Sequence, residues 1–298
     1  MAAVKGSLGV VGASGFIGME LARQASRVGW RVVGFSRRPQ PAGDPVAEWR
    51  RWDDAPDLSG LKVVANLAGK PVDCRWTESN QRAMRDSRIG VTEAIVGAIR
   101  ARAAGERPAV LLNGSAVGIY GDRGDERLSD SATAGSGFLA GLCRDWEAAA
   151  DPAAELGVRV LKWRTGVVLG EGGAAWTKMR RAFALGLGGR FGDGRQWLPW
   201  IHVGDLVAGM LHALDSRLSG PVNGTAPEPE RNAEFTRRLA AALHRPAVLH
   251  APGWALRLGL GGFASALLGS QRAIPTALLA DGFRFRYPTF EAALADLV

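Results

Sequence analysis

The stretch Val10-Val11-Gly12-Ala13-Ser14-Gly15-Phe16-Ile17-Gly18 decides how the rest of the chain can fold. An apolar run, Leu8 to Val11, comes before the glycines, and apolar residues recur at helical spacing from Met19 to Ala25. The glycines therefore lie on a turn between a strand and a helix. Glycines in this position permit a tight turn, close approach of the backbone to a pyrophosphate, and close packing of helix on strand.

The spacing of these glycines is G-x-x-G-x-x-G, which leaves two interpretations open. The turn can be an ordinary strand-to-helix connection. It can also bind the phosphates of a dinucleotide, because the unpaired N–H groups and the dipole at a helix N-terminus favour anions. The flanking strand and helix favour the second interpretation, in which the candidate cofactor-binding residues are Gly12, Ser14, Gly15, Phe16 and Ile17.

A second strand is predicted at Trp30 to Phe35, and Ser36, Arg37, Arg38 and Pro39 follow it. In this type of fold an acidic residue near the end of that strand binds the ribose 2′-hydroxyl of NAD, whereas arginine accommodates the 2′-phosphate of NADP. Here the acid is absent and two arginines are present. They can also simply solubilise a loop, but their distance of about twenty residues from the glycine turn favours NADP.

Strands continue to alternate with helices along the first half of the chain. The predicted strands are Ala47 to Trp52, Leu61 to Asn66, Ala109 to Leu112 and Val158 to Thr165, and helices are predicted at Glu78 to Arg100 and Phe138 to Ala150. This alternation, without an internal repeat, predicts an α/β fold with a Rossmann-type, doubly wound parallel sheet.

Ligands bind to such sheets beyond the carboxyl ends of the strands. The segments expected to meet there are Gly12 to Ile17, Ser36 to Arg38, Asn66 to Gly69 and Gly114-Ser115. The small residues of Leu67-Ala68-Gly69 would let a ring or a ribose lie against the backbone, although they also suit a plain turn. Gly69 and Ser115 therefore join the candidate cofactor-binding residues.

The composition changes after Gly166, where glycine-rich loops and a tail broken by prolines and glycines begin. We expect residues 1–165 to form the Rossmann domain, with residues 200–225 returning to it. Residues 166–199 and 226–298 are expected to form a smaller, noncontiguous substrate domain. A small-molecule substrate would then lie in the cleft between the two domains.

Local patterns in this second half give two further predictions and one open question. Asp205 is predicted to be the N-cap of a helix at Leu206 to Leu214, and Phe283 to Pro288 has the pattern of a short strand. The aromatic segment before that helix either lines a substrate pocket or belongs to the core; it contains Trp197, Trp200 and His202.

The chain has 298 residues, of which 47% are hydrophobic and 22% charged, enough for one large α/β domain with a smaller partner. Its two cysteines, Cys74 and Cys143, lack metal-ligand spacing, and Met1 to Gly6 has no signal-type apolar region, so a cytoplasmic protein is expected. The longest apolar stretch, Trp254 to Leu268, is interrupted by Arg257 and is too short to span a membrane.

The net charge of +8 raises the question of nucleic-acid binding. The basic residues are scattered in pairs such as Arg50-Arg51 and Arg180-Arg181, and only five of the 37 are lysine. This distribution indicates an arginine-rich composition rather than a binding stripe. We therefore expect no nucleic-acid partner and a monomer or a homodimer.

The motifs along the chain resemble those of the extended short-chain dehydrogenase/reductase superfamily, and more closely its branch of epimerase family proteins with a C-terminal domain of unknown function. They cover nearly the whole chain in order: Gly12-Ala-Ser-Gly-Phe-Ile-Gly18, Asn66-Leu-Ala-Gly69, Arg75-Trp76, Asp86-Ser-Arg88, Ser115-Ala-Val-Gly-Ile-Tyr120-Gly121, Gly137-Phe-Leu139, Arg144-Asp-Trp-Glu147, Arg164-Thr-Gly-Val-Val-Leu-Gly170, Gly186-Leu-Gly-Gly189, Gly194-Arg-Gln-Trp197, Trp200-Ile-His202 and Gln271-Arg272. The resemblance implies a Rossmann fold, NADP as cofactor and an interdomain substrate cleft. It also implies cofactor neighbours at Ser36, Arg37, Leu67, Ala68, Arg88 and Thr165.

The sequence departs from this superfamily at its catalytic pair. Most members use a tyrosine with a lysine four residues later, which lowers the tyrosine pKa so that the phenol can act as general acid or base. The two tyrosines of this chain, Tyr120 and Tyr287, are followed four residues later by Gly124 and Glu291. Tyr120 is therefore interpreted as a packing residue or a wall of the cofactor site.

The helix expected to carry the pair offers Phe138 or Leu139 first and Leu142 or Cys143 four residues later. One hypothesis is an NADP-dependent oxidoreductase or epimerase whose proton is moved by another group: His202, a water held by Ser115, or a carbonyl polarised by an arginine. The other is a binding module that senses the NADP/NADPH ratio.

Overall fold

Seven parallel strands form the central sheet of the computed structural model, which describes residues 5–38 and 40–298. In spatial order they are β12 (Gly220–Gly224), β7 (Arg159–Thr165), β5 (Val110–Ala116), β4 (Val63–Asn66), β1 (Gly6–Val11), β2 (Trp30–Ser36) and β3 (Glu48–Arg51). The predicted doubly wound parallel sheet is therefore confirmed. The order reverses between β1 and β4, and such a reversal is where these sheets bind ligands.

Two predictions involve residues outside this range. Residues 1–4 belong to the segment Met1 to Gly6 on which the expected location rests, and Pro39 ends the segment that follows the second predicted strand; both lie outside the described residues.

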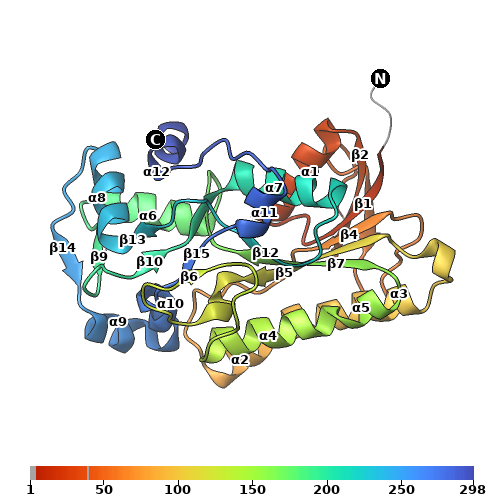
Figure 1. The fold of residues 1–298 in the computed structure, drawn as a ribbon, viewed down its shortest axis with the longest axis horizontal. Helices are drawn as coiled ribbons and strands as arrows, with labels where there is room; N and C mark the ends of the chain where they lie inside the picture. Colours follow the sequence, from red (N-terminus) through yellow and green to blue (C-terminus); the bar gives the residue numbers. More distant parts are fainter. Residues whose placement is uncertain (1–4, 39) are drawn as a thin grey trace.

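Helices cover both faces of the sheet (Figure 1). On one face α1 (Phe16–Arg27) and α7 (Val203–Asp215) pack against each other and against alternate residues of β1, including Leu8 and Val10. On the other face α3 (Val91–Arg100), α4 (Phe138–Ala150) and α5 (Pro152–Glu155) share a second core with Val11. Since side chains alternate along a strand, burial of both faces explains the nearly continuous apolar runs of these strands.

The helical segment predicted from Glu78 to Arg100 is present and contains a π-helical turn in its middle. It consists of α2 (Glu78–Arg85), a π-helical turn η1 (Asp86–Gly90) and α3. The Thr77 side chain caps α2 by accepting a hydrogen bond from the Asn80 N–H. Single π turns often occur at functional sites, and this one carries Arg88.

Most elements after β7, apart from those that belong to the main sheet or pack on it, gather at one end of the molecule (Figure 1). Four two-stranded pairs lie outside the main sheet: β8 (Val167–Leu169) with β11 (Trp200–His202), β10 (Trp197–Leu198) with β13 (Glu230–Arg231), β9 (Gly189–Phe191) with β14 (Leu249–Ala251), and β15 (Arg272–Ala273) with β6 (Arg127–Leu128). The helices there are α6 (Ala174–Ala184), α8 (Asn232–Ala242), α9 (Gly253–Leu260), α10 (Ala264–Leu268) and α12 (Phe290–Leu297), whereas α11 (Thr276–Ala280) packs against β12 of the main sheet. Short 3-10 turns are η2 (Ala104–Glu106), η3 (Val117–Tyr120) and η4 (Gly261–Phe263). The division into two domains at the expected boundaries stays a prediction.

Two local predictions are wrong, and one contact explains both. The N-cap of α7 is His202, whose Nδ1 accepts a hydrogen bond from the Gly204 N–H, whereas Asp205 lies inside the first turn. The Asp205 carboxylate instead accepts hydrogen bonds from the backbone N–H groups of Arg286 and Tyr287, at 2.9 and 2.8 Å. These donors are thereby used by a side chain, and residues 283–288 form an irregular segment rather than the predicted strand.

In the described part of the chain, every helix is too short or too polar to cross a lipid bilayer.

Candidate functional site

The glycine turn joins β1 to α1 and is tightly packed. Gly12 has a φ of +87°, and a Cβ added there would lie 3.0 Å from the backbone carbonyl group of Leu67. A Cβ on Gly18 would lie 2.2 Å from the carbonyl oxygen of Gly12. The first position thus requires glycine for its conformation and the last for close packing of the helix on the turn.

The N-terminus of α1 keeps its donors free of side-chain partners. Its N-cap is Gly15, and no side chain caps the helix. Ser14 and Gly15 are exposed, while the ring of Phe16 packs so closely on Gly170 and Gly173 that a Cβ on either would lie 2.8 Å from it. The turn is therefore open towards solvent and braced from the side of β8, with Ile17 half-buried next to it.

The two arginines after β2 lie at the same edge of the sheet. Arg37 and Arg38 are both exposed, and within residues 5–38 and 40–298 neither guanidinium forms an ion pair or hydrogen bond. Ser36 is half-buried, and its hydroxyl accepts a hydrogen bond from the Arg38 N–H at 3.2 Å. This edge consequently presents two unpaired positive charges beside the glycine turn.

The buried side-chain amide of Asn66 holds the turn after β4 in place. The Asn66 Nδ2 group donates to the Thr92 hydroxyl at 3.0 Å and to Asn113 Oδ1 at 2.8 Å, and Asn66 Oδ1 accepts from the Ala68 N–H at 3.3 Å. Leu67 and Ala68 remain half-buried and Gly69 is exposed. The backbone of this turn therefore faces the Gly12 turn of β1.

Arg88 lies across this turn. Its guanidinium is 3.0 Å from the position of a Cβ on Gly69, and it lies over the ring of Trp146 at 5.2 Å from the centroid. The side chain is half-buried, and Arg88 Nη1 donates a hydrogen bond to the Met84 carbonyl oxygen at 3.2 Å. Burial lowers the pKa of Arg88 from its usual value, and no described carboxylate lies within ion-pair distance. An anion beside Arg88 would therefore be favourable.

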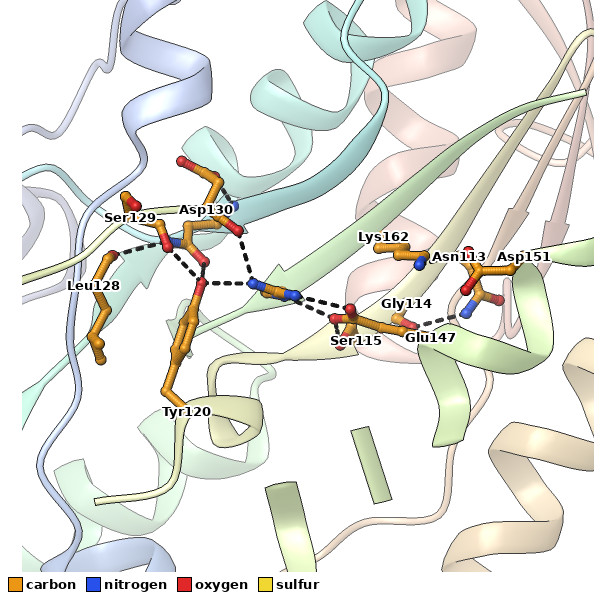
Figure 2. A network of polar contacts seen from close by, with 12 residues as sticks. Asn113, Gly114, Ser115, Tyr120, Leu128, Ser129, Asp130, Glu147, Asp151 and Lys162 are labelled. Atoms are coloured by element: carbon orange, nitrogen blue, oxygen red, sulfur yellow. Dashed lines mark hydrogen bonds and ion pairs between the residues drawn. The ribbon is translucent and has the colours of Figure 1, made fainter. Parts of the chain in front are cut away.

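A buried group of side chains, here called the polar network, occupies the adjacent corner of the sheet (Figure 2). The Ser115 hydroxyl at the end of β5 donates to Glu147 Oε1 of α4 at 2.6 Å. Arg164 of β7 binds both oxygens of Glu147, with Nε and Nη2 at 2.8 and 2.9 Å. Although burial disfavours the charge, the hydrogen bond to Glu147 holds the pKa of Arg164 above its usual range.

Tyr120 extends the polar network towards β12. Its hydroxyl accepts a hydrogen bond from Arg164 Nη1 at 3.0 Å and donates to Asn223 Oδ1 at 2.6 Å. The Asn223 Nδ2 group donates to the carbonyl oxygens of Leu128 and Ile274. Burial raises the pKa of Tyr120, so the phenol stays protonated at neutral pH. Tyr120 is thus a buried structural residue of this corner.

Further contacts join the polar network to the C-terminal segment. The carboxylate of Asp130 accepts hydrogen bonds from the Asn223 N–H, the Thr276 hydroxyl and the Ala277 N–H. Figure 2 shows Asp130, Tyr120 and Ser115 in one continuous set of contacts with Glu147. All of these groups have partners, which makes the corner rigid.

The two catalytic candidates from the sequence lie on opposite faces of the sheet. Ser115 is turned towards α4, whereas His202 lies at the start of α7. The His202 ring packs on Tyr287 with 4.0 Å between centroids, and Nε2 lies 3.4 Å from Asp296 Oδ2. Burial lowers the pKa of His202. The structure does not bring these two side chains together.

Of the aromatic residues near His202, Trp200 is fully buried, and its Nε1 donates to the Glu228 carbonyl oxygen at 3.0 Å. Trp197 is half-buried, and the guanidinium groups of Arg231 and Arg272 lie 4.6 and 4.5 Å from the centroid of its ring.

The start of α4 is apolar where the superfamily pattern would place its tyrosine and lysine. Phe138 and Leu139 are half-buried, and Leu142 and Cys143 are buried. Burial raises the pKa of the Cys143 thiol to about 12, so it is not a proton donor or nucleophile near neutral pH.

Sequence reasoning missed Glu147, Arg164 and Asn223. A signal for Glu147 was present, because Cys143, Glu147 and Ala150 share the buried face of α4, and a carboxylate on such a face requires a partner. Thr165, at the end of β7, is half-buried beside Arg164. Among residues 5–38 and 40–298, no three His, Cys, Asp or Glu side chains are grouped to hold a metal ion.

Comparison with known proteins places the chain in a family. Residues 8–226 match the NAD dependent epimerase/dehydratase family, and residues 251–297 match a domain of unknown function, DUF1731. The chain belongs to the NAD-dependent epimerase/dehydratase family. The epimerase family protein Mb2239 of Mycobacterium bovis is 40% identical over 291 residues, which cover 96% of this chain and 95% of that protein. The resemblance stated from the motifs is thereby confirmed.

Solved structures of this epimerase/dehydratase type share the fold. The human epimerase family protein SDR39U1, solved with NADPH, is 33% identical, with a TM-score of 0.89 and 98% of both chains covered. UDP-glucose 4-epimerase of Thermus thermophilus, solved with NAD, has a TM-score of 0.73 over 97% of this chain and 96% of that one, at 18% identity. The epimerase/dehydratase chain described here therefore has a Rossmann-like, NAD(P)-binding fold.

Proposed function

We propose that this chain binds NADP(H) at the carboxyl edge of its sheet and acts as an oxidoreductase that lacks the Tyr–Lys pair of its superfamily. The observation that carries the proposal is the pair of exposed guanidiniums, Arg37 and Arg38, which have no partner among the described residues and lie beside an α1 N-terminus without a side-chain cap. Both features leave hydrogen-bond donors for phosphate groups. The NADPH complex of human SDR39U1 supports the same cofactor.

Each element of the edge has a role in this proposal. The turn from Gly12 to Ile17 binds the pyrophosphate, because Ser14 and Gly15 are exposed and no side chain caps the N-terminus of α1. Ser36, Arg37 and Arg38 bind the 2′-phosphate. The turn Leu67-Ala68-Gly69, together with Arg88 and Thr165, forms the wall for the nicotinamide half.

NADPH, when bound, supplies a hydride. The chain orients the ring, and its substrate lies between the Rossmann domain and the smaller domain formed by residues 166–199 and 226–298. Ser115 and His202 are left out of this proposed site, since the hydroxyl of Ser115 is taken up by Glu147 and His202 lies against α12.

A second candidate function is an NADP(H)-sensing protein without turnover. The observation in its favour is the polar network: the serine and tyrosine nearest the expected catalytic position have satisfied partners, and Cys143 is buried. Tight NADPH binding without oxidation by any acceptor would favour this candidate.

Equilibrium titration of the Arg37→Ala variant tests the proposed site. Loss of one charge-assisted hydrogen bond costs about 1.5–3 kcal/mol, so the Kd for NADPH is expected to rise about 10- to 150-fold. The Kd for NADH is expected to change less than about twofold, because NADH has no 2′-phosphate. Equal losses for both cofactors would refute the assignment of Arg37.

A further inference from the structure

Three half-buried aromatic side chains from separate segments meet beside the proposed cofactor edge. Trp76 follows the β4 turn, Phe138 begins α4 and Phe263 belongs to η4; together they are here called the aromatic cluster. The ring centroids of Trp76 and Phe138 are 4.9 Å apart, and those of Trp76 and Phe263 are 6.5 Å apart. A Cβ on Gly262 would lie 2.7 Å from the Trp76 ring, so η4 approaches that ring directly.

The aromatic cluster is held in place on both sides. Trp76 Nε1 donates to the Val72 carbonyl oxygen at 2.9 Å, so the indole has no polar group left to satisfy. Asp73 pairs with Lys178 of α6, which ties the same loop to the second half of the chain. Next to Phe138, Leu139 contacts Gly118 just beyond β5. The cluster thus lies where β4 and β5 end.

Phe138 stands at one of the two positions where the superfamily pattern has its tyrosine. The neighbouring polar groups offer no replacement acid, because Ser115 and Tyr120 are bound within the polar network and burial keeps the Cys143 thiol protonated. A sugar or simple carbonyl acceptor needs a proton delivered as the hydride arrives. A conjugated ring does not, because it spreads the negative charge over its own atoms.

Aromatic faces and an unpaired cation suit such a ring. Stacking on Trp and Phe supplies binding without hydrogen bonds, as it does for nucleobases. Arg88 lies beside the β4 turn and has no carboxylate within ion-pair distance among the described residues, so it favours a delocalised anion nearby.

We propose that the hydride acceptor is a flat conjugated ring, a para-quinone or an isoalloxazine, stacked against the solvent-accessible part of the aromatic cluster, whose three residues are each half-buried. This inference rests on the proposed function. The acceptor takes up the hydride with both electrons as the C4–H bond of the dihydronicotinamide breaks, and a new bond forms to a quinone oxygen or to isoalloxazine N5. The single negative charge is then neutralised by a proton from water, so NADPH, acceptor and one proton give NADP⁺ and the reduced acceptor.

The test compares Trp76→Ala with wild type, using menadione and riboflavin as acceptors. The chain is expected to oxidise NADPH with at least one of them, and Trp76→Ala is expected to raise the KM of that acceptor about tenfold. Quenching of riboflavin fluorescence by the chain gives a readout without NADPH and should weaken in parallel if the isoalloxazine is the ligand. Trp76→Phe should retain most of the binding, because it keeps an aromatic face.

Trp254→Ala is the matched control, since Trp254 of α9 is 69% exposed and should leave the KM unchanged. The Kd for NADPH is measured on every variant and separates the two proposals. If NADPH binds but neither acceptor is reduced, or if Trp76→Ala behaves as Trp254→Ala does, the aromatic-cluster proposal is overturned. Reduction of glyceraldehyde in preference to both rings would also overturn it. If NADPH does not bind, the proposed function itself is refuted.

Discussion

Two regions at the same edge of the sheet differ in how completely their polar groups are paired. Around the glycine turn, the first donors of α1 have no side-chain cap, and the guanidiniums of Arg37 and Arg38 have no partner in the described part of the chain. In the polar network, Ser115 and Arg164 both donate to the Glu147 carboxylate, at 2.6 to 2.9 Å. Donors without a protein partner are available to bind a ligand, whereas polar groups that are fully hydrogen-bonded to one another stabilise the fold.

The proposed function uses this difference, because it assigns cofactor binding to the unpaired donors and a structural role to the polar network. A catalytic serine needs a hydroxyl free to reach substrate, yet Ser115 is buried and faces a carboxylate. That carboxylate is neutralised by a bidentate arginine, a geometry typical of buried structural pairs. The edge therefore combines an open side, where the glycine turn and Arg37 are exposed, with a closed corner formed by the polar network.

The largest expected effect concerns the closed corner. Glu147→Gln leaves the buried charge of Arg164 without its partner, which is expected to cost about 3–5 kcal/mol in the free energy of unfolding. Urea denaturation followed by circular dichroism measures this loss. Glu234→Gln is the control, because Glu234 pairs with Arg237 on the exposed face of α8 and should leave the midpoint unchanged. An unchanged midpoint for Glu147→Gln would contradict a structural role for the pair.

The next effect concerns the open side. Gly18→Ala places a Cβ 2.2 Å from the Gly12 carbonyl oxygen and must displace the turn. Such overpacking costs about 1–3 kcal/mol, so the Kd for NADPH is expected to rise about 5- to 150-fold. Calorimetric titration measures it.

Gly97→Ala is the control for this substitution. Gly97 lies in α3, and a Cβ there would have no neighbour within 4 Å. NADPH binding should be unaffected, and the helix should gain about 1 kcal/mol in stability. Equal effects of the two alanines on NADPH binding would show that the glycine turn does not hold the cofactor.

Periodicity and glycine spacing predicted the sheet, its parallel order and the segments at its carboxyl edge, because these signals are local. The polar network could not be predicted in the same way. Tyr120 and Asn223 are 103 residues apart in sequence, and their contact depends on β12 joining the sheet next to β7. Glu147 and Arg164 are 17 residues apart and lie on different elements.

The two wrong local predictions have the same origin. Asp205 has the residue type of an N-cap, but His202 took that position and left the carboxylate to bind the backbone of Arg286 and Tyr287. The strand pattern from Phe283 to Pro288 was overridden by that tertiary contact. Local propensity limits the conformations that a segment can adopt, and tertiary contacts determine which of them it adopts.

The smallest expected effect tests the central claim most directly, which is that cofactor binding is separated from the polar network. The measurement is the Kd for NADPH, together with the rate of NADPH oxidation by menadione, for Ser115→Ala against wild type. Because the Ser115 hydroxyl donates to Glu147 within the polar network, both values are expected to stay within about twofold, with a stability loss of about 1 kcal/mol. A fall in the oxidation rate of about a hundredfold or more, the loss typical of removing a group that moves a proton, would contradict the claim.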